Sequence, residues 1–382
     1  MLKYFKNLCP RVFLLGVIFA LVSLSIIGYF LSNKDDIFQN YSRSHLTISP
    51  ETLFFPSAAQ LITLSKKRLP EDKIAVIIGG SSVMRGAGQN EINLWSSKLE
   101  ALLGDNYKVL NLAVNGGRPA GQGLYAAETL LKEGRKVIFI SDIAMANTFL
   151  VPDNGRVYRS FFFDALARGY IDANDLRLNR VKSLIEAEGD PSAWDEHRIK
   201  SYTNNALNFD DFWNLIGYKY FFTIWTPLLS DNSWKGRNKL PDNEGDCIPG
   251  NGPNGGYSKN YDIEMTIMRG LSNAKLSEEI MRQEIFSSIP KSVIPNTMFV
   301  LNLYSPFYVE KLSSSERQAY NNNFNTSKKV YESFGITSVI MGMKNNQWDY
   351  CDRAHLTVSG GSNLANDLAP FVRMKAKELG YD

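Results

Sequence analysis

The chain has 382 residues, of which 44% are hydrophobic and 21% are charged, and its formal net charge is +3. A chain of this length and composition can bury a full hydrophobic core, which excludes intrinsic disorder and a membrane protein with many spans. The 42 basic and 39 acidic residues nearly balance and form no dense basic stripe, so nucleic-acid binding is not expected.

Cysteine and histidine are scarce, and this limits the chemistry that the chain can perform. It has three of each, with no CxxC pair and no HxxxH spacing. A local zinc motif is therefore absent, and neither a metal nor an organic cofactor is expected. A reaction that needs an imidazole base must use His45, His197 or His355.

An uncharged apolar run occupies residues 12–31. At ~1.5 Å per residue it is long enough to span the ~30 Å hydrocarbon layer as one transmembrane helix. The only charged residues that precede the run are basic. This places residues 1–11 in the cytoplasm and the rest of the chain outside the cytoplasmic (inner) membrane, either periplasmic or extracellular. A cleaved signal peptide is the alternative, but its apolar region would be shorter and would end in small residues.

The cysteines divide between the two predicted sides of the membrane. Cys9 precedes the apolar run, whereas Cys247 and Cys351 are the only cysteines on the outer side, where disulfides persist. We expect a Cys247–Cys351 bond, which would tie a glycine- and proline-rich loop at residues 244–256 to the residue before Asp352. Two free thiols are the alternative.

Strand and helix patterns alternate after a connector over residues 32–70, in which a helix is expected over residues 57–68. Continuous apolar runs predict buried parallel strands, and leucines and alanines at helical spacing predict helices between them. Strands are expected over residues 74–78, 108–113, 136–140, 298–303 and 336–340, and further helices over residues 121–133, 314–334 and 364–379. This alternation is typical of an α/β fold with a parallel sheet.

The strand pattern lapses in the middle of the chain. We therefore expect one α/β core made of residues 71–150 and 291–382, interrupted by a helical and loop insertion over residues 151–290. The insertion contains an aromatic stretch at residues 212–225. Such a stretch is expected in a core or, alternatively, on the membrane interface or a membrane partner.

A serine follows the first predicted strand in a glycine-rich turn, at residues 79–86. The carboxyl edge of a parallel sheet is where ligands bind, and backbone N–H groups there can stabilise an oxyanion. A serine hydroxyl becomes a nucleophile only when a base removes its proton. The turn matches neither the P-loop nor the dinucleotide fingerprint, so nucleotide binding is not expected.

His355 is the histidine best placed to act as that base. Asp352 precedes it by three residues, and on one loop turn the carboxylate could accept the Nδ1 proton and leave Nε2 facing the serine. The other two histidines lie near the tether and in a charged stretch. Taken singly, each residue also has a structural explanation, since Ser82 could cap a helix and Asp352 a turn.

Three blocks of the sequence resemble those of the SGNH (GDSL-type) hydrolases. The family's first block, G-D-S-x-x-x-G, resembles residues 80–86, which implies that Ser82 rather than Ser81 is the nucleophile. Its second block, an Asn followed by a glycine that donates to the oxyanion, resembles residues 111–116. Its last block, D-x-x-H-L, resembles residues 352–356.

The resemblance implies a three-layer (flavodoxin-like) parallel sheet with helices on both faces. It also implies a catalytic triad of Ser82, His355 and Asp352 that forms an acyl-enzyme, with the backbone amides of Ser82 and Gly116 holding the oxyanion. The sequence departs from the family pattern in two places. Ser81 replaces the usual first-block Asp, and the residues after the third strand contain no Asn in register, Asn147 being the nearest substitute.

With its tether, the chain resembles the extracytoplasmic SGNH proteins that handle acyl groups on envelope polymers, such as polysaccharide O-acetyltransferases and the D-alanine transfer protein of teichoic acid D-alanylation. This implies a serine esterase or O-acyltransferase acting on O-acetyl or similar groups of a cell-envelope or exported polysaccharide. A membrane-bound O-acyltransferase is the implied partner. The alternative is a catalytically impaired SGNH fold that serves such a partner as a scaffold or glycan-binding protein.

Overall fold

The computed structural model describes residues 9–32, 46–49, 52–54, 58–114, 119, 121–142, 246–249, 261–274, 278–279, 281–282, 285 and 289–381. Most of the predicted insertion lies outside these residues, and so does its aromatic stretch at residues 212–225. Gly116 and Asn147 also lie outside the described residues, as do His45 and His197.

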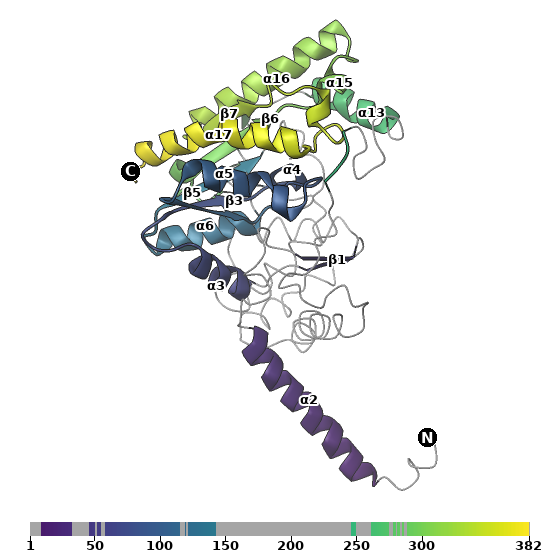
Figure 1. The fold of residues 1–382 in the computed structure, drawn as a ribbon, viewed down its shortest axis with the longest axis vertical. Coiled ribbons are helices and arrows are strands. Elements are labelled where there is room, and N and C mark those ends of the chain that lie inside the picture. The colour runs from purple at the N-terminus through teal and green to yellow at the C-terminus, as the bar shows by residue number, and fades with distance from the viewer. Residues whose placement is uncertain are drawn as a thin grey trace.

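Helix α2 spans Pro10–Ser32 and covers the apolar run near the N-terminus. Figure 1 shows it standing apart from the sheet and the helices around the sheet. Side chains are described only for the first part of α2. Within the described residues, no helix is both long enough and apolar enough to cross a membrane. The helix is confirmed, whereas the transmembrane anchor at residues 12–31 stays a prediction.

Five parallel strands form the central sheet, in the order β4-β3-β5-β6-β7. Their bounds are Ile74–Ile78 (β3), Tyr107–Asn111 (β4), Val137–Asp142 (β5), Thr297–Asn302 (β6) and Thr337–Met341 (β7). Counted along the chain this is the order 2-1-3-4-5 of one class of doubly wound sheets. The predicted α/β fold with a parallel sheet is confirmed, and each strand lies within two residues of its predicted bounds.

Helices cover both faces of this sheet (Figure 1). One face packs against α5 (Trp95–Leu103) and α17 (Val358–Glu378), and the other against α3 (Ala58–Arg68), α6 (Gln122–Lys132) and α16 (Ser314–Ser333), with α13 (Tyr261–Ser272) on α16. Successive residues of β3 enter the two cores in turn. Because both faces are buried, the strands are continuous apolar runs in the sequence, which is why they could be predicted.

Several elements differ from the prediction. Helix α5 was not predicted, nor was the antiparallel hairpin of β1 (Leu46–Ser49) and β2 (Thr52–Phe54) in the connector. Helix α17 begins at Val358, six residues before the predicted start, with Thr357 as its N-cap. The glycines in its first turn do not indicate a helix in the sequence. Gly360 is required there because a Cβ would overlap the carbonyl oxygen of Asp349.

The close approach of β3 to α6 generates a stability prediction. A Cβ at Gly123 would lie 2.8 Å from Gly79 Cα, and backbone cannot move aside as a side chain can. We expect Gly123→Ala to lower the free energy of unfolding by ~1–3 kcal/mol, although alanine is the better helix former. Urea unfolding of the full chain measures this change.

The matched control is Gly270→Ala in α13, where a Cβ would meet nothing within 4 Å. There the substitution should raise the free energy of unfolding by up to ~1 kcal/mol. Equal stabilisation by the two substitutions would contradict the close approach of Gly123 to Gly79.

Candidate active site

The turn after β3 places Ser82 at the carboxyl edge of the sheet. Ser82 is the first residue of α4 (Ser82–Arg85), and Ser81 is the N-cap, since Ser81 Oγ accepts a hydrogen bond from Val83 N at 3.2 Å. The explanation of Ser82 as a helix cap is therefore wrong. The turn also requires Gly80, which has φ +104 and leaves no room for a Cβ.

His355 joins Ser82 to Asp352. Its Nε2 lies 2.7 Å from Ser82 Oγ, and its Nδ1 lies 2.7 Å from Asp352 Oδ2. Ser82 is half-buried, and the side chains of His355 and Asp352 are 18% and 8% exposed. The structure thus brings the three predicted residues together in a continuous hydrogen-bonded chain that is still open to solvent at the imidazole.

The loop that carries Asp352 and His355 is held by its own hydrogen bonds. Asp352 Oδ1 accepts from the backbone N–H groups of Ala354 and His355, each at 2.9 Å. Cys351 N donates to His355 O at 2.8 Å, and Tyr350 bridges to Leu356. This tight turn is the physical reason for the D-x-x-H spacing, because it places the carboxylate beside the imidazole.

These contacts set the charge of Asp352. Burial by itself raises the pKa of the Asp352 carboxyl, but the hydrogen bond and charge of His355 and the backbone N–H groups outweigh it, and the pKa falls to about 2. The carboxylate is therefore ionised at neutral pH. An ionised partner fixes the Nδ1–H tautomer and stabilises the imidazolium that forms when Nε2 accepts a proton.

A second carboxylate, which the sequence analysis missed, lies beneath the serine turn. Asp142 ends β5, is buried, and accepts from Ser81 N at Oδ1 over 2.8 Å, while Ser81 Oγ donates to its Oδ2. Burial raises the pKa of Asp142, and the hydrogen bonds from Ser81 oppose this only in part. The sequence feature that could have indicated Asp142 as a site residue is a charged residue at the end of a continuous apolar strand.

An arginine within the His355 loop forms a partly buried ion pair. Arg353 Nε lies 2.6 Å from Glu264 Oε2, and its guanidinium lies 4.9 Å from the centre of the Tyr304 ring. Glu264 belongs to α13, so the pair ties the loop to that helix. Sequence reasoning did not find this pair, because neither residue has a local pattern that points to the other.

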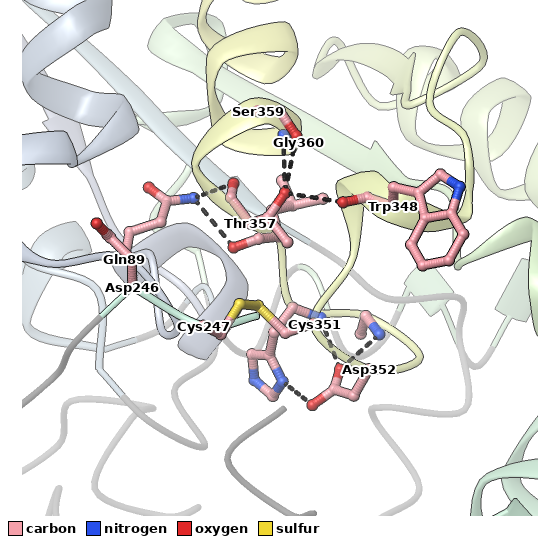
Figure 2. Close-up of a disulfide and its surroundings, with 12 residues drawn as sticks. Gln89, Asp246, Cys247, Trp348, Cys351, Asp352, Thr357, Ser359 and Gly360 are labelled. Atoms are coloured by element: carbon pink, nitrogen blue, oxygen red, sulfur yellow. Dashed lines mark hydrogen bonds and ion pairs between the residues drawn. A yellow bond between two sulfur atoms is a disulfide. The ribbon is translucent and has the colours of Figure 1, made fainter. Parts of the chain in front are cut away.

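The predicted disulfide between Cys247 and Cys351 is confirmed, with the two Cα atoms 5.8 Å apart. The alternative of two free thiols is therefore wrong, and Cys9 is a free, exposed cysteine. Figure 2 shows the bond beside the loop that carries Asp352. In the part of the chain that the structure describes, no group of three or more His, Cys, Asp or Glu side chains is placed to hold a metal ion.

The predicted oxyanion donors are only partly described. Ser82 is the first residue of α4, and Val114 N donates to Gly80 O at 3.1 Å. The chain after β4 therefore runs beside the serine turn, two residues before Gly116.

A hydroxyl, an imidazole and a carboxylate in this order can perform nucleophilic acyl chemistry. No protein-family model matches the chain, and no curated protein matches it.

The lowered pKa of Asp352 predicts how stability depends on pH. The folded value of about 2 lies below the ordinary 3.8, so the carboxylate stabilises the fold above about pH 4, and this contribution disappears as the pH falls through 2. We expect Asp352→Asn to remove ~2 kcal/mol of acid-dependent stability. Urea unfolding between pH 5 and pH 2 measures it, with Asp105→Asn at an exposed position as the control. The same pH dependence in Asp352→Asn and the native chain would contradict the assignment.

Asp142 generates a second prediction, because an amide can replace its carboxyl. In Asp142→Asn the amide oxygen still accepts from Ser81 N and the amide nitrogen can donate to Ser81 Oγ, whereas Asp142→Ala removes the acceptor of both Ser81 N–H and Ser81 O–H. We expect the alanine variant to lose ~2–3 kcal/mol of unfolding free energy and the asparagine variant less than ~1 kcal/mol. Chemical denaturation tests this, and equal losses would show that these hydrogen bonds do not stabilise the turn.

Proposed function

We propose that the protein is an SGNH-type serine esterase or acyltransferase, with Ser82 as nucleophile, His355 as general base and Asp352 as the residue that orients the imidazole. The observation that carries the proposal is the pair of 2.7 Å contacts from His355 Nε2 to Ser82 Oγ and from His355 Nδ1 to Asp352 Oδ2. The strand order supports it, since the chain leaves the neighbouring strands β3 and β5 toward opposite edges of the sheet, and ligands bind at such a point.

The geometry gives each residue one task. As Ser82 Oγ attacks the acyl carbonyl carbon, its proton passes to His355 Nε2, and the ionised Asp352 stabilises the resulting imidazolium. The N–H groups of Ser82 and Gly116 would bind the oxyanion. His355 then gives the proton to the leaving alcohol, and an acyl-enzyme remains on Ser82. Deacylation uses water in an esterase, or a sugar hydroxyl in an acyltransferase.

One observation favours a site on the outer side of a membrane, and another favours the catalytically impaired alternative. The sequence has no Asn in register after β5, and one missing oxyanion donor costs ~3 kcal/mol of transition-state stabilisation, which slows reaction with water and with a sugar hydroxyl alike. The Cys247–Cys351 bond is of a kind that persists in oxidising compartments. We place the active site extracytoplasmically on an anchor formed by residues 12–31, acting on acyl groups of an envelope or exported polysaccharide with a membrane-bound O-acyltransferase as partner.

Covalent labelling of the full chain in detergent with a fluorophosphonate tests the nucleophile without knowledge of the substrate. Ser82→Ala and His355→Ala should each reduce labelling by at least ~10³-fold, because nucleophile and base act as a unit. Ser97→Ala, at an exposed position on α5, is the matched control and should label like the native chain. Labelling that is independent of Ser82, or none in a chain that melts cooperatively, would contradict the proposal and favour the scaffold or glycan-binding alternative.

A further inference from the structure

The proposed site is divided between two loops that lie far apart in the sequence. Ser82 leads through α4 into residues 86–93, whereas Asp352 and His355 lie in the loop over residues 350–356. Hydrogen bonds within that second loop fix Asp352 against His355, as described above. They do not fix His355 relative to Ser82. That distance depends on the contacts that join the two loops.

One such contact is made by the buried side chain of Gln89. Its Nε2 donates to the carbonyl oxygens of Leu356 and Thr357, at 3.3 and 3.2 Å. Its Oε1 accepts from Trp95 N at 3.0 Å, which holds the amide in place. Gln89 therefore joins the loop after α4 to the residues that follow His355.

The disulfide makes a second connection, on the other side of the catalytic pair. Cys351 directly precedes Asp352 and is fully buried, and its partner Cys247 donates its backbone N–H to Gly88 O at 2.8 Å. Figure 2 shows the disulfide between the labelled residues Asp246 and Asp352. The loop after α4, residue 247 and the His355 loop are thus linked in series.

Asp246 fixes the outer end of this link. Its Oδ1 accepts from Asn90 N at 2.8 Å, and its Oδ2 accepts from Asn90 Nδ2 at 2.9 Å and from Asn93 Nδ2 at 2.7 Å. Three hydrogen bonds to one carboxylate hold the backbone of residues 246 and 247 against the loop after α4. The disulfide consequently transmits the position of that loop to Cys351.

Gly88 shows how closely the parts fit. It has φ +91, and a Cβ there would lie 2.6 Å from Cys351 Sγ and 3.0 Å from Cys247 Sγ. The sulfur atoms therefore pack directly on the backbone of Gly88. A side chain at this position would push the disulfide, and the loop attached to it, away from α4.

We propose that the Cys247–Cys351 disulfide, held by Asp246 and seated on Gly88, is a positioning element that keeps His355 within hydrogen-bonding reach of Ser82. The inference rests on the proposed function, because only then does this distance govern a reaction. Loss of the bond releases Cys351 and lets the His355 loop move as a unit, with its Asp352–His355 contact intact. A misplacement of 1 Å can slow a reaction by ~10²-fold.

The first test removes both sulfur atoms from the full chain. In Cys247→Ala/Cys351→Ala we expect the maximal rate of fluorophosphonate labelling to fall by ~10- to 100-fold, while the probe concentration that gives half the maximal rate stays unchanged. Val372→Ala, in the core about four turns along α17 from its start next to the His355 loop, is the control for lost stability. Its maximal labelling rate should equal that of the native chain under conditions in which both variants are folded.

The second test leaves the disulfide in place. Gly88→Ala should lower the maximal labelling rate in the native background and lower it much less in the chain without the two sulfur atoms, since the Cβ then has no sulfur to displace. This non-additivity separates pressure on the disulfide from backbone strain at Gly88, because the strain is the same in both backgrounds.

The outcomes distinguish this inference from the proposed function. Ser82-dependent labelling of the native chain, together with a native labelling rate in the folded sulfur-free variant, overturns the positioning role alone. Absence of Ser82-dependent labelling in the native chain overturns the function and the inference with it. Should the sulfur-free variant fail to fold, Gly88→Ala in the native background decides, and a native labelling rate there overturns the inference.

Discussion

The pairing of β5 with β6 is the contact on which the rest of the molecule depends. Phe139 to Asp142 pair in parallel with Thr297 to Val300, and this joins the strands before the long intervening segment to those after it in one sheet. Both hydrophobic cores extend across the junction. Because parallel strands end at the same edge, the pairing also brings the turn after β3 to the side of the sheet where the His355 loop lies.

The two carboxylates of the site have opposite pKa shifts, and the surroundings explain the difference. Both carboxyls are buried, and burial by itself raises the pKa of each. Asp352 receives hydrogen bonds from two backbone N–H groups and from the imidazole, and these favour its charged form. Asp142 is held chiefly by the backbone N–H and the hydroxyl of Ser81, and these do not outweigh the effect of its burial. One group is thereby suited to hold an imidazolium, and the other to fix the turn that carries Ser82.

The described parts of the segment between β5 and β6 hold the His355 loop from both sides of Asp352. Cys247 is bonded to Cys351, and Glu264 is paired with Arg353. The residues on either side of Asp352 are thus fixed by Cys247 and Glu264, which lie between the two halves of the sheet in the sequence. The described residues of this segment before β6 lie outside the five-stranded sheet, and they still contribute to the geometry of the site.

The sequence was sufficient for features that arise from local pattern. Strands buried on both faces are continuous apolar runs, so β3 to β7 could be predicted to within two residues. The D-x-x-H spacing predicted a carboxylate beside an imidazole, because one turn suffices to bring them together. Likewise, only two cysteines followed the apolar run, so a single pairing was possible between them.

Tertiary structure alone decided what depends on contacts between distant residues. Ser81 rather than Ser82 caps α4, and it does so while bonded to Asp142, 61 residues away. The serine and the imidazole are 273 residues apart, and no local spacing specifies a 2.7 Å contact over that separation. The early start of α17 was hidden for the same reason, since Gly360 is required by the backbone of Asp349 and not by the helix itself. Local patterns determine which elements form, whereas the packing of these elements determines which side chains meet.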